Sequence, residues 1–221
     1  MSCASNDVES CVACPRLSAH LMGLRQREPD WHNRPVPAFG SLAARLLIVG
    51  LGPGEKGANR TGRPFAGDVA GDLLYPALHR FGFASAPEAL DKDKAANPRL
   101  RLVDVRITNA VRCLPPANKP TPAEIRACNA HLRREIAAMP RLAAILALGG
   151  ISHQAVLRAL HIKPASHPFG HALRYEFPAP LPTLFTSYHC SGYNWRTGRL
   201  SRESFERVFE RIRAFLATKS D

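Results

Sequence analysis

The chain has 221 residues, enough to bury one hydrophobic core, and we expect a single domain over residues 1–221. Its 30 Lys and Arg residues outnumber 18 Asp and Glu residues, which gives a formal net charge of +12. This excess favours an anionic partner, nucleic acid before an anionic membrane, over an ordinary basic surface. No apolar run approaches the roughly 20 residues of a membrane span, and the N-terminus lacks a signal-peptide pattern. These observations predict a cytoplasmic protein without a membrane partner.

The predicted elements alternate between helices and strands. Residues 1–9 are expected to form a flexible tail, and a short helix from Ser10 is expected to contain Cys11 and Cys14. Four apolar segments then have the composition of buried strands, at residues 46–50, 102–111, 142–148 and 183–188. Helices are predicted to begin near Asp68, Thr121, Gly150 and Ser201. The pattern favours an α/β fold: a three-layer α/β/α sandwich around a four-stranded parallel sheet. No element is predicted for residues 163–181.

Two of these helices have clear boundary signals. Thr121-Pro122-Ala123-Glu124 is a capping box with proline at the first helical position. Gly82 is a suitable residue just beyond the helix that begins near Asp68.

The stretch from Arg45 to Gly71 combines a buried strand, a glycine-rich loop and a helix start. Open α/β sheets place their ligands at such a junction. Gly52 and Gly54 let the backbone approach a bound group closely, while Phe65 offers a flat apolar surface and Asp68 a carboxylate.

Two more polar residues follow strands. Asn109 ends the second predicted strand and His189 ends the fourth. Because the carboxyl ends of parallel strands meet at one edge of the sheet, we expect both residues to lie beside the glycine-rich loop.

Four of the six cysteines have the spacing of metal ligands. Cys11 and Cys14 form C-x2-C, and Cys113 and Cys128 form C-x14-C. Four thiolates suit a [4Fe–4S] cluster or a zinc ion, and the lack of a second C-x2-C puts the cluster slightly ahead of zinc. Buried cysteines without a ligand are the third possibility. A cluster would tie the N-terminal segment to the middle of the sheet, which is a structural task.

Three stretches of the sequence accompany the cysteine spacing: GLGPGEKGANRTGRPFAGD, TNAVRC and SYHCSGYNWRTGRL. Through these stretches and the spacing, the chain resembles the iron–sulfur uracil-DNA glycosylases. The resemblance covers about residues 11–215 and is greatest to the family 5, or type B, branch. Leu51 stands where family 4 members have an acidic residue, and Asp68 supplies the carboxylate. Cys190 replaces the proline that usually follows the histidine.

The resemblance implies an α/β/α sandwich and a [4Fe–4S] cluster on Cys11, Cys14, Cys113 and Cys128. It also implies a monofunctional glycosylase that removes uracil, and other deaminated bases such as hypoxanthine, from DNA. The expected partner is double-stranded DNA, with single-stranded DNA as a second candidate, bound by a monomer at the nucleoid of a bacterium.

The chemistry of base removal assigns roles to four residues. Asp68, held ionised by a helix N-terminus, would stabilise the cationic sugar and orient water. His189 would donate to uracil O2, Phe65 would stack on the flipped ring, and Asn109 would pair with O4 and N3–H. Each residue also has a simpler interpretation: Asp68 as a helix cap and His189 as a packed histidine. Phe65 would then be a core aromatic, and Asn109 would satisfy a local turn.

The remaining candidates would contact DNA or the base. Backbone amides near Gly52 and Gly54 would hold the base or a phosphate, and Tyr193 or Trp195 would fill the gap that the base leaves. Side chains proposed to contact phosphates are Arg60, Arg63, Ser191, Asn194 and Arg196.

Two alternative functions belong to other classes. A basic iron–sulfur module that binds DNA without catalysis would use Asp68 and His189 structurally. A dinucleotide-dependent oxidoreductase would use Gly52, Gly54 and Gly57 as G-x-G-x-x-G, although Pro53 removes one backbone amide from that loop.

Overall fold

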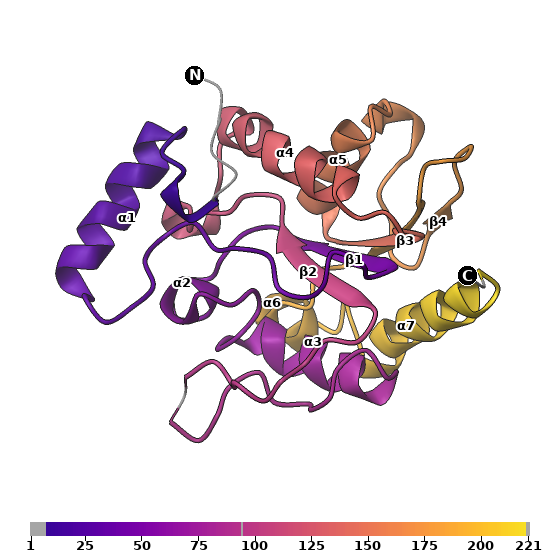
Figure 1. Cartoon of the computed structure of the whole chain (residues 1–221), viewed down its shortest axis with the longest axis horizontal. Coiled ribbons are helices and arrows are strands. Elements are labelled where there is room, and N and C mark those ends of the chain that lie inside the picture. Colours follow the sequence, from indigo (N-terminus) through magenta and orange to yellow (C-terminus); the bar gives the residue numbers. More distant parts are fainter. Residues whose placement is uncertain (1–7, 94, 220–221) are drawn as a thin grey trace.

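A computed structural model describes residues 8–93 and 95–219 of the chain (Figure 1). At its centre is a five-stranded sheet with the strand order β2-β1-β3-β5-β4. Four strands pair in parallel: β1 (Leu46–Gly50), β2 (Val105–Asn109), β3 (Ala144–Leu148) and β5 (Thr183–Ser187). The short strand β4 (Arg174–Tyr175) joins β5 antiparallel at the edge.

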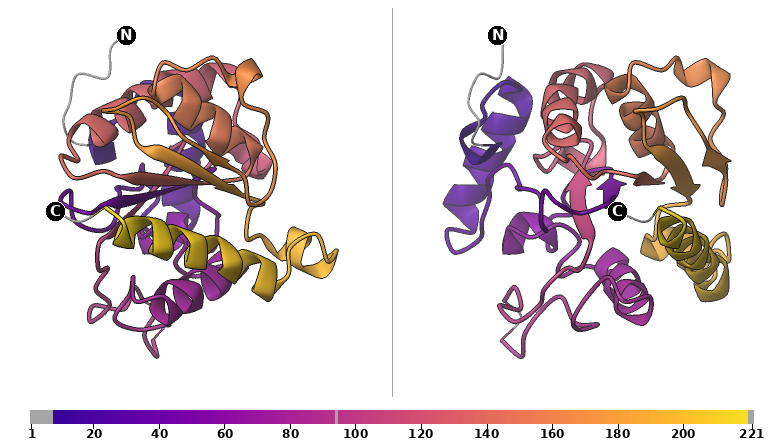
Figure 2. Two further views of the ribbon diagram at one scale, coloured as in Figure 1. Left: turned by 90° about the vertical axis from the view of Figure 1, so that its right-hand side faces the viewer. Right: turned by 45° about the vertical axis from the view of Figure 1, so that its right-hand side comes forward.

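Helices cover both faces of this sheet. Their bounds are α1 (Pro15–Arg27), α2 (Ala58–Thr61), α3 (Val69–Arg80), α4 (Pro122–Ala137), α5 (Gly150–Ala159), α6 (Gly192–Arg196) and α7 (Arg202–Ala217). Figure 2 shows α4 and α5 on one face and α3 and α7 on the other. The core divides accordingly, because Leu46 and Ile48 of β1 pack in the cluster of α3 and α7, whereas Leu47 and Val49 pack with α1, α4 and α5. The predicted three-layer sandwich is confirmed.

Local hydrogen bonds define the helix ends that the sequence predicted. The Glu124 N–H donates to Thr121 Oγ1 at 3.2 Å, and the Thr121 N–H donates to Glu124 Oε2 at 2.7 Å, which completes the capping box of α4. Ser201 caps α7 in the same way. Gly82 follows α3 with a left-handed φ of +71°, a conformation that glycine adopts at little cost.

Two expectations about elements are wrong. The sheet has a fifth strand, because residues 163–181 include β4, whose two residues are too few to show an alternating pattern. Cys11 and Cys14 are not in a helix: α1 begins at Pro15, whose missing N–H suits the first helical position, and Cys14 is its extended N-cap residue. Val8 and Glu9 belong to a short 3-10 turn (Val8–Ser10), while residues 1–7 of the predicted tail lie outside the described residues.

Helices α2 and α6 were not predicted. Each is a single turn, too short to produce an amphipathic period, and each lies next to a candidate site residue. Within residues 8–93 and 95–219, no helix has the length and apolarity that crossing a bilayer requires.

Candidate active site

Gly50, the last residue of β1, lies under the side chains of Asn109 and Phe65. A Cβ atom at this position would be 2.4 Å from Asn109 Oδ1 and 2.5 Å from the Phe65 ring, so only glycine leaves room for both. Asn109 ends β2 and is the register partner of Gly50. The first two predicted site residues therefore meet at the carboxyl edge of the sheet.

The Asn109 side chain holds an unsatisfied hydrogen-bond acceptor. Asn109 is 3% exposed, and its Oδ1 atom has no hydrogen-bond partner among residues 8–93 and 95–219. Leaving a buried acceptor without a donor costs about 1–3 kcal/mol. The interpretation of Asn109 as a residue that satisfies a local turn does not account for this oxygen, whereas an N–H group of a ligand would satisfy it.

Phe65 has a backbone conformation that is rare for a bulky residue. Its φ is +59°, in the left-handed region. Two contacts with α3 hold this conformation. Tyr75 Oη donates to the Pro64 carbonyl at 2.7 Å. The Phe65 carbonyl oxygen packs so closely on Gly71 that a Cβ atom there would be only 1.7 Å from it. Such strained residues cluster at binding and active sites. The ring of Phe65 is thus placed by the start of α3.

His189 reaches the same edge from β5. Its ring stacks with that of Phe65, with centroids 5.9 Å apart and planes 25° apart. Asn194 Nδ2 donates to the His189 carbonyl at 2.8 Å and so fixes the turn that carries the histidine. Burial lowers the pKa of His189 to about 4, so the imidazole is neutral at physiological pH, with one N–H donor and one acceptor.

Asp68 is both the N-cap of α3 and a neighbour of the glycine-rich loop. Its Oδ1 accepts from the Gly71 N–H at 3.1 Å, whereas Cβ atoms at Gly54 and Gly57 would lie 2.8 Å and 2.5 Å from its Oδ2. The two oxygens therefore have different surroundings. The helix-cap interpretation holds for Oδ1 and leaves Oδ2 facing the loop.

The pKa of Asp68 shifts in the direction opposite to our expectation. Burial raises this pKa above its ordinary value, and the backbone amides of Gly71 and Ala70 oppose the shift without reversing it. Burial and then the Asp68 charge raise the pKa of the Cys190 thiol. Asp68 therefore lies near the residue that follows His189.

The predicted DNA contacts after His189 surround helix α6. Ser191 caps this helix by accepting from the Asn194 N–H at 3.4 Å, so Ser191 and Asn194 both shape the turn of His189. Arg196 is exposed, and Tyr193 is 66% exposed. The phosphate contacts of these residues remain predictions.

The other two predicted arginines lie near the glycine-rich loop and make contacts within the chain. Arg63 Nη1 donates to the Asn97 carbonyl at 2.6 Å, and its guanidinium lies 4.5 Å from the Phe39 ring centroid. Arg60 Nε donates to the Lys56 carbonyl at 3.0 Å. Gly52 packs close to the Val111 carbonyl, which a Cβ atom would approach to 3.4 Å.

Cys11, Cys14, Cys113 and Cys128 line one cavity between α1, α4 and the segment after β2. None of the four forms a disulfide. Burial, and then the charges of the other three thiols, raise the pKa of Cys113. Among the described residues, no three His, Cys, Asp or Glu side chains are arranged to hold a metal ion. Four thiols around one largely apolar cavity nevertheless fit a group with four thiolate ligands.

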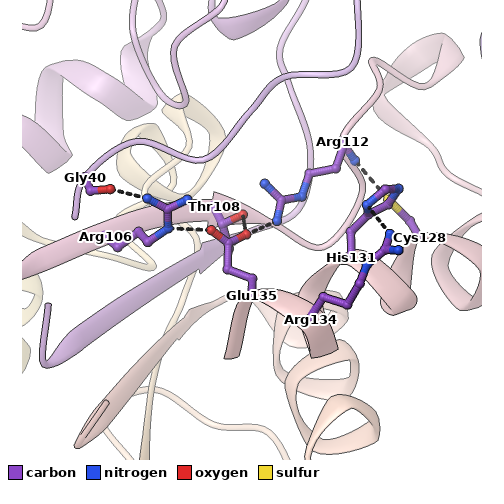
Figure 3. A network of polar contacts seen from close by, with 8 residues as sticks. All are labelled: Gly40, Arg106, Thr108, Arg112, Cys128, His131, Arg134 and Glu135. Carbon is purple, nitrogen blue, oxygen red and sulfur yellow. Dashed lines mark hydrogen bonds and ion pairs between the residues drawn. The ribbon is translucent and has the colours of Figure 1, made fainter. Parts of the chain in front are cut away.

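A buried ionic network connects β2 and α4 beside this cavity (Figure 3). Glu135 accepts from Arg106 Nε at 2.5 Å, from Thr108 Oγ1 at 3.1 Å and from Arg112 Nη2. The Arg112 N–H donates to Cys128 Sγ at 3.3 Å. No local pattern in the sequence predicts this network, because its residues come from separate elements.

The contacts of His131 with the cavity were also not predicted from the sequence. His131 Nε2 lies 3.4 Å from Cys11 Sγ. One signal was available in the sequence, because residue 131 follows Cys128 by one helical turn and therefore shares its face of α4.

The fold is that of an α/β protein in which Phe65, Asn109 and His189 gather at the carboxyl ends of the parallel strands, where such sheets place their ligands. Residues 37–213 match the model of the uracil DNA glycosylase superfamily. The type-5 uracil-DNA glycosylase of Thermus thermophilus is 45% identical over 205 residues, which cover 90% of each chain. That of Pyrobaculum aerophilum is 37% identical over 213 residues, 95% of this chain and 90% of its own. The chain belongs to the uracil-DNA glycosylase superfamily.

Type-4 members of the superfamily are also similar to the chain. The type-4 uracil-DNA glycosylase of Archaeoglobus fulgidus is 30% identical over 192 residues, 84% of this chain and 85% of its own. The type-5 proteins share more identity over a larger part of the chain, in agreement with the predicted branch.

Proposed function

We propose that this chain is a monofunctional uracil-DNA glycosylase that hydrolyses the N-glycosidic bond of uracil in DNA and leaves an abasic site. The observation that carries this proposal is the buried, unsatisfied Oδ1 of Asn109 beside the Phe65 ring. The N3–H of an extruded uracil would donate to this oxygen. Neutral cytosine has no hydrogen at N3, so the same contact discriminates between the two pyrimidines.

Phe65 would bind the flat face of the extruded base. Its ring already stacks with His189, and its backbone is held in a strained conformation by Tyr75 and Gly71. A ring held in advance loses little freedom when the base arrives, so more of the stacking energy remains available for binding.

Asp68 and His189 would act on the bond to be broken. The bond between C1′ of the sugar and N1 of uracil breaks with its electron pair leaving on the base, and a water oxygen then bonds to C1′. The Asp68 carboxylate would stabilise the positive sugar and orient the water. The neutral His189 N–H would donate to uracil O2 as negative charge develops there, and the water proton leaves to solvent or to the departing base.

The DNA would lie across the turn from His189 to Leu200. Arg196 and Arg199 are exposed there, Arg199 lies over the Tyr188 ring, and Tyr193 projects from α6. Double-stranded DNA is the expected substrate and single-stranded DNA the second candidate, with hypoxanthine among the other bases removed. We expect a monomer that works at the bacterial nucleoid in the cytoplasm.

Cys11, Cys14, Cys113 and Cys128 would hold a [4Fe–4S] cluster. Their shared cavity supports this assignment. When bound, the cluster would supply a covalent cross-link between the N-terminal segment, the end of β2 and α4, and we assign it no part in bond cleavage. Iron and sulfide analysis with the visible spectrum distinguishes it from zinc, because a zinc protein is colourless.

Incubation with a uracil-containing oligonucleotide followed by alkali tests the enzymatic proposal. A strand break at the uracil position, absent from the thymine control, is the expected result. An intact strand would contradict it and favour the DNA-binding module instead. Membership of a glycosylase superfamily favours neither that module nor the dinucleotide-dependent oxidoreductase.

A further inference from the structure

Both ring nitrogens of His131 make polar contacts at the wall of the cysteine cavity. The residue is 5% exposed and lies on α4 between Cys128 and Arg134. Its Nδ1 is 3.0 Å from Arg134 Nη2, and its Nε2 is 3.4 Å from Cys11 Sγ. Figure 3 shows Cys128, His131 and Arg134 together beside the Arg112 backbone.

The partner at Nδ1 determines where the ring proton lies. An arginine side chain only donates hydrogen bonds, so Nδ1 must accept from Arg134 and carries no hydrogen itself. The single proton of the neutral ring is therefore on Nε2, which is the nitrogen that faces the Cys11 sulfur. A doubly protonated ring would place two donors against each other at Nδ1.

We infer that His131 is a positioning residue for the iron–sulfur cluster proposed above: its Nε2–H donates to the Cys11 thiolate, and Arg134 holds the ring in that tautomer. The inference rests on the proposed cofactor. Hydrogen bonds to ligand sulfurs stabilise their negative charge and help to set the reduction potential of a cluster. The Arg112 N–H makes the corresponding bond to Cys128 Sγ, so two of the four sulfurs receive a donor from this wall.

The spacing of residues along α4 explains how one helix supplies all three side chains. Cys128, His131 and Arg134 follow one another at intervals of three residues and therefore share one side of the helix. One rigid helix thus presents a ligand, a donor to a second ligand, and the group that orients that donor. Arg133 is exposed on the same helix and shows no contact with the cavity, which makes it a matched control for Arg134.

The test uses the full chain purified without oxygen, with its cluster content measured as iron and sulfide. Resonance Raman spectroscopy reports the Fe–S(Cys) stretching band, and spectroelectrochemical titration reports the reduction potential. His131→Phe removes the donor and keeps a ring, and Arg134→Met removes the group that orients His131. We expect both variants to show a higher Fe–S(Cys) frequency and a more negative potential than wild type, while Arg133→Met matches wild type in both. Uracil excision by the loaded variants should equal that of wild type.

An unchanged Raman band in either loaded variant would overturn the inference. If His131→Phe does not fold, Arg134→Met decides alone, because Arg134 is exposed and its replacement disturbs no core. A wild-type protein without iron would overturn the cofactor proposal together with this inference. A wild-type protein that contains the cluster but does not excise uracil would contradict only the enzymatic proposal. The two proposals therefore fail in distinguishable ways.

Discussion

The rings of Phe65 and His189 stack at a centroid distance of 5.9 Å although the two residues lie far apart in the sequence. Phe65 belongs to the loop after β1 and His189 to the turn after β5, and only β3 separates these strands in the sheet. Both segments leave the sheet at the same edge, where Asn109 also ends β2. The stack therefore couples the surface proposed to bind the base with the donor proposed to polarise it.

Replacement of Asp68 by Asn should remove catalysis and keep the fold. Asparagine caps helices as well as aspartate does, so α3 should retain its start. The amide cannot supply the negative charge at Oδ2, and we expect the single-turnover rate of uracil removal to fall about 10²–10⁴-fold. Binding to an abasic-site duplex should change little.

Asp72→Asn is the matched control for that experiment. Asp72 is exposed in the first turn of α3 and lies on the same helix. Its replacement should leave both excision and abasic-site binding close to wild type. Equal losses of excision and binding in Asp68→Asn would mean that Asp68 builds the DNA surface instead.

His189 should act as a neutral donor. Its pKa of about 4 means that the imidazole loses its charge well below pH 6, and the raised pKa of Asp68 places its ionisation above the ordinary value. Excision requires neutral His189 and ionised Asp68, so the rate should fall as the pH drops through the pKa values of both groups. His189 should contribute no inflection at the ordinary histidine pKa, so an inflection there that His189→Gln removes would contradict this assignment.

Side-chain substitutions at His189 separate donation from packing. His189→Ala should lower the single-turnover rate about 10²–10³-fold. His189→Gln retains an N–H donor of similar reach and should recover part of that loss. Equal rates for the two variants would exclude a donating role.

Gly50→Ala should disturb the base site through sterics alone. The new methyl group would collide with Asn109 Oδ1 and with the Phe65 ring, so at least one of them must move. We expect stability to fall by about 1–3 kcal/mol. A displacement near 1 Å should lower excision roughly 10²-fold.

Gly23→Ala in α1 is the control for Gly50→Ala, since its added methyl group would meet nothing within 4 Å. It should raise stability by about 0.5–1 kcal/mol, because alanine favours the helix interior, and it should leave excision unchanged. Urea denaturation and single-turnover kinetics on both variants provide the comparison. A fully active Gly50→Ala protein would show that the packing over Gly50 is irrelevant to the reaction.

Glu135→Gln should be among the more damaging substitutions away from the site. Glu135 pairs with Arg106 and with the buried Arg112, so its replacement leaves a buried guanidinium without a countercharge. We expect a loss of about 3–5 kcal/mol, measured by urea denaturation. The exposed Glu210→Gln should change stability by less than about 0.5 kcal/mol.

The pKa of Glu135 gives the same network a pH dependence. Burial would raise this pKa, but the charges of Arg112 and Arg106 outweigh burial and lower it. A lowered pKa means that the ionised carboxylate contributes stability above its unfolded pKa, and that this stability is lost as the pH falls through the folded value. Wild type should therefore lose stability in acid more steeply than Glu135→Gln does.

The sequence predicted the features that depend on neighbouring residues. The capping box at Thr121 and Glu124 was found because its hydrogen bonds lie within four residues, and the four parallel strands because apolar runs mark buried strands. The helix expected over Cys11 and Cys14 was wrong because the start signal at Pro15 was overlooked.

Features that depend on tertiary packing could not be predicted in this way. The pKa of Asp68 rises because burial outweighs the helix N-terminus, and burial is a property of the folded chain. The open acceptor of Asn109 depends on which groups of the described residues pack around it, and the contact between Cys11 and His131 joins distant segments. The residue types at the site were predictable, but their free hydrogen-bonding atoms were not.

The most direct test of the proposed base recognition compares single-turnover excision of uracil with that of N3-methyluracil from otherwise identical duplexes. Wild type should prefer uracil, because only uracil donates an N3–H to Asn109 Oδ1, and Asn109→Ala should lose roughly 10- to 100-fold of that preference. The same preference in wild type and Asn109→Ala, or none in wild type, would contradict the assignment of this oxygen to the base.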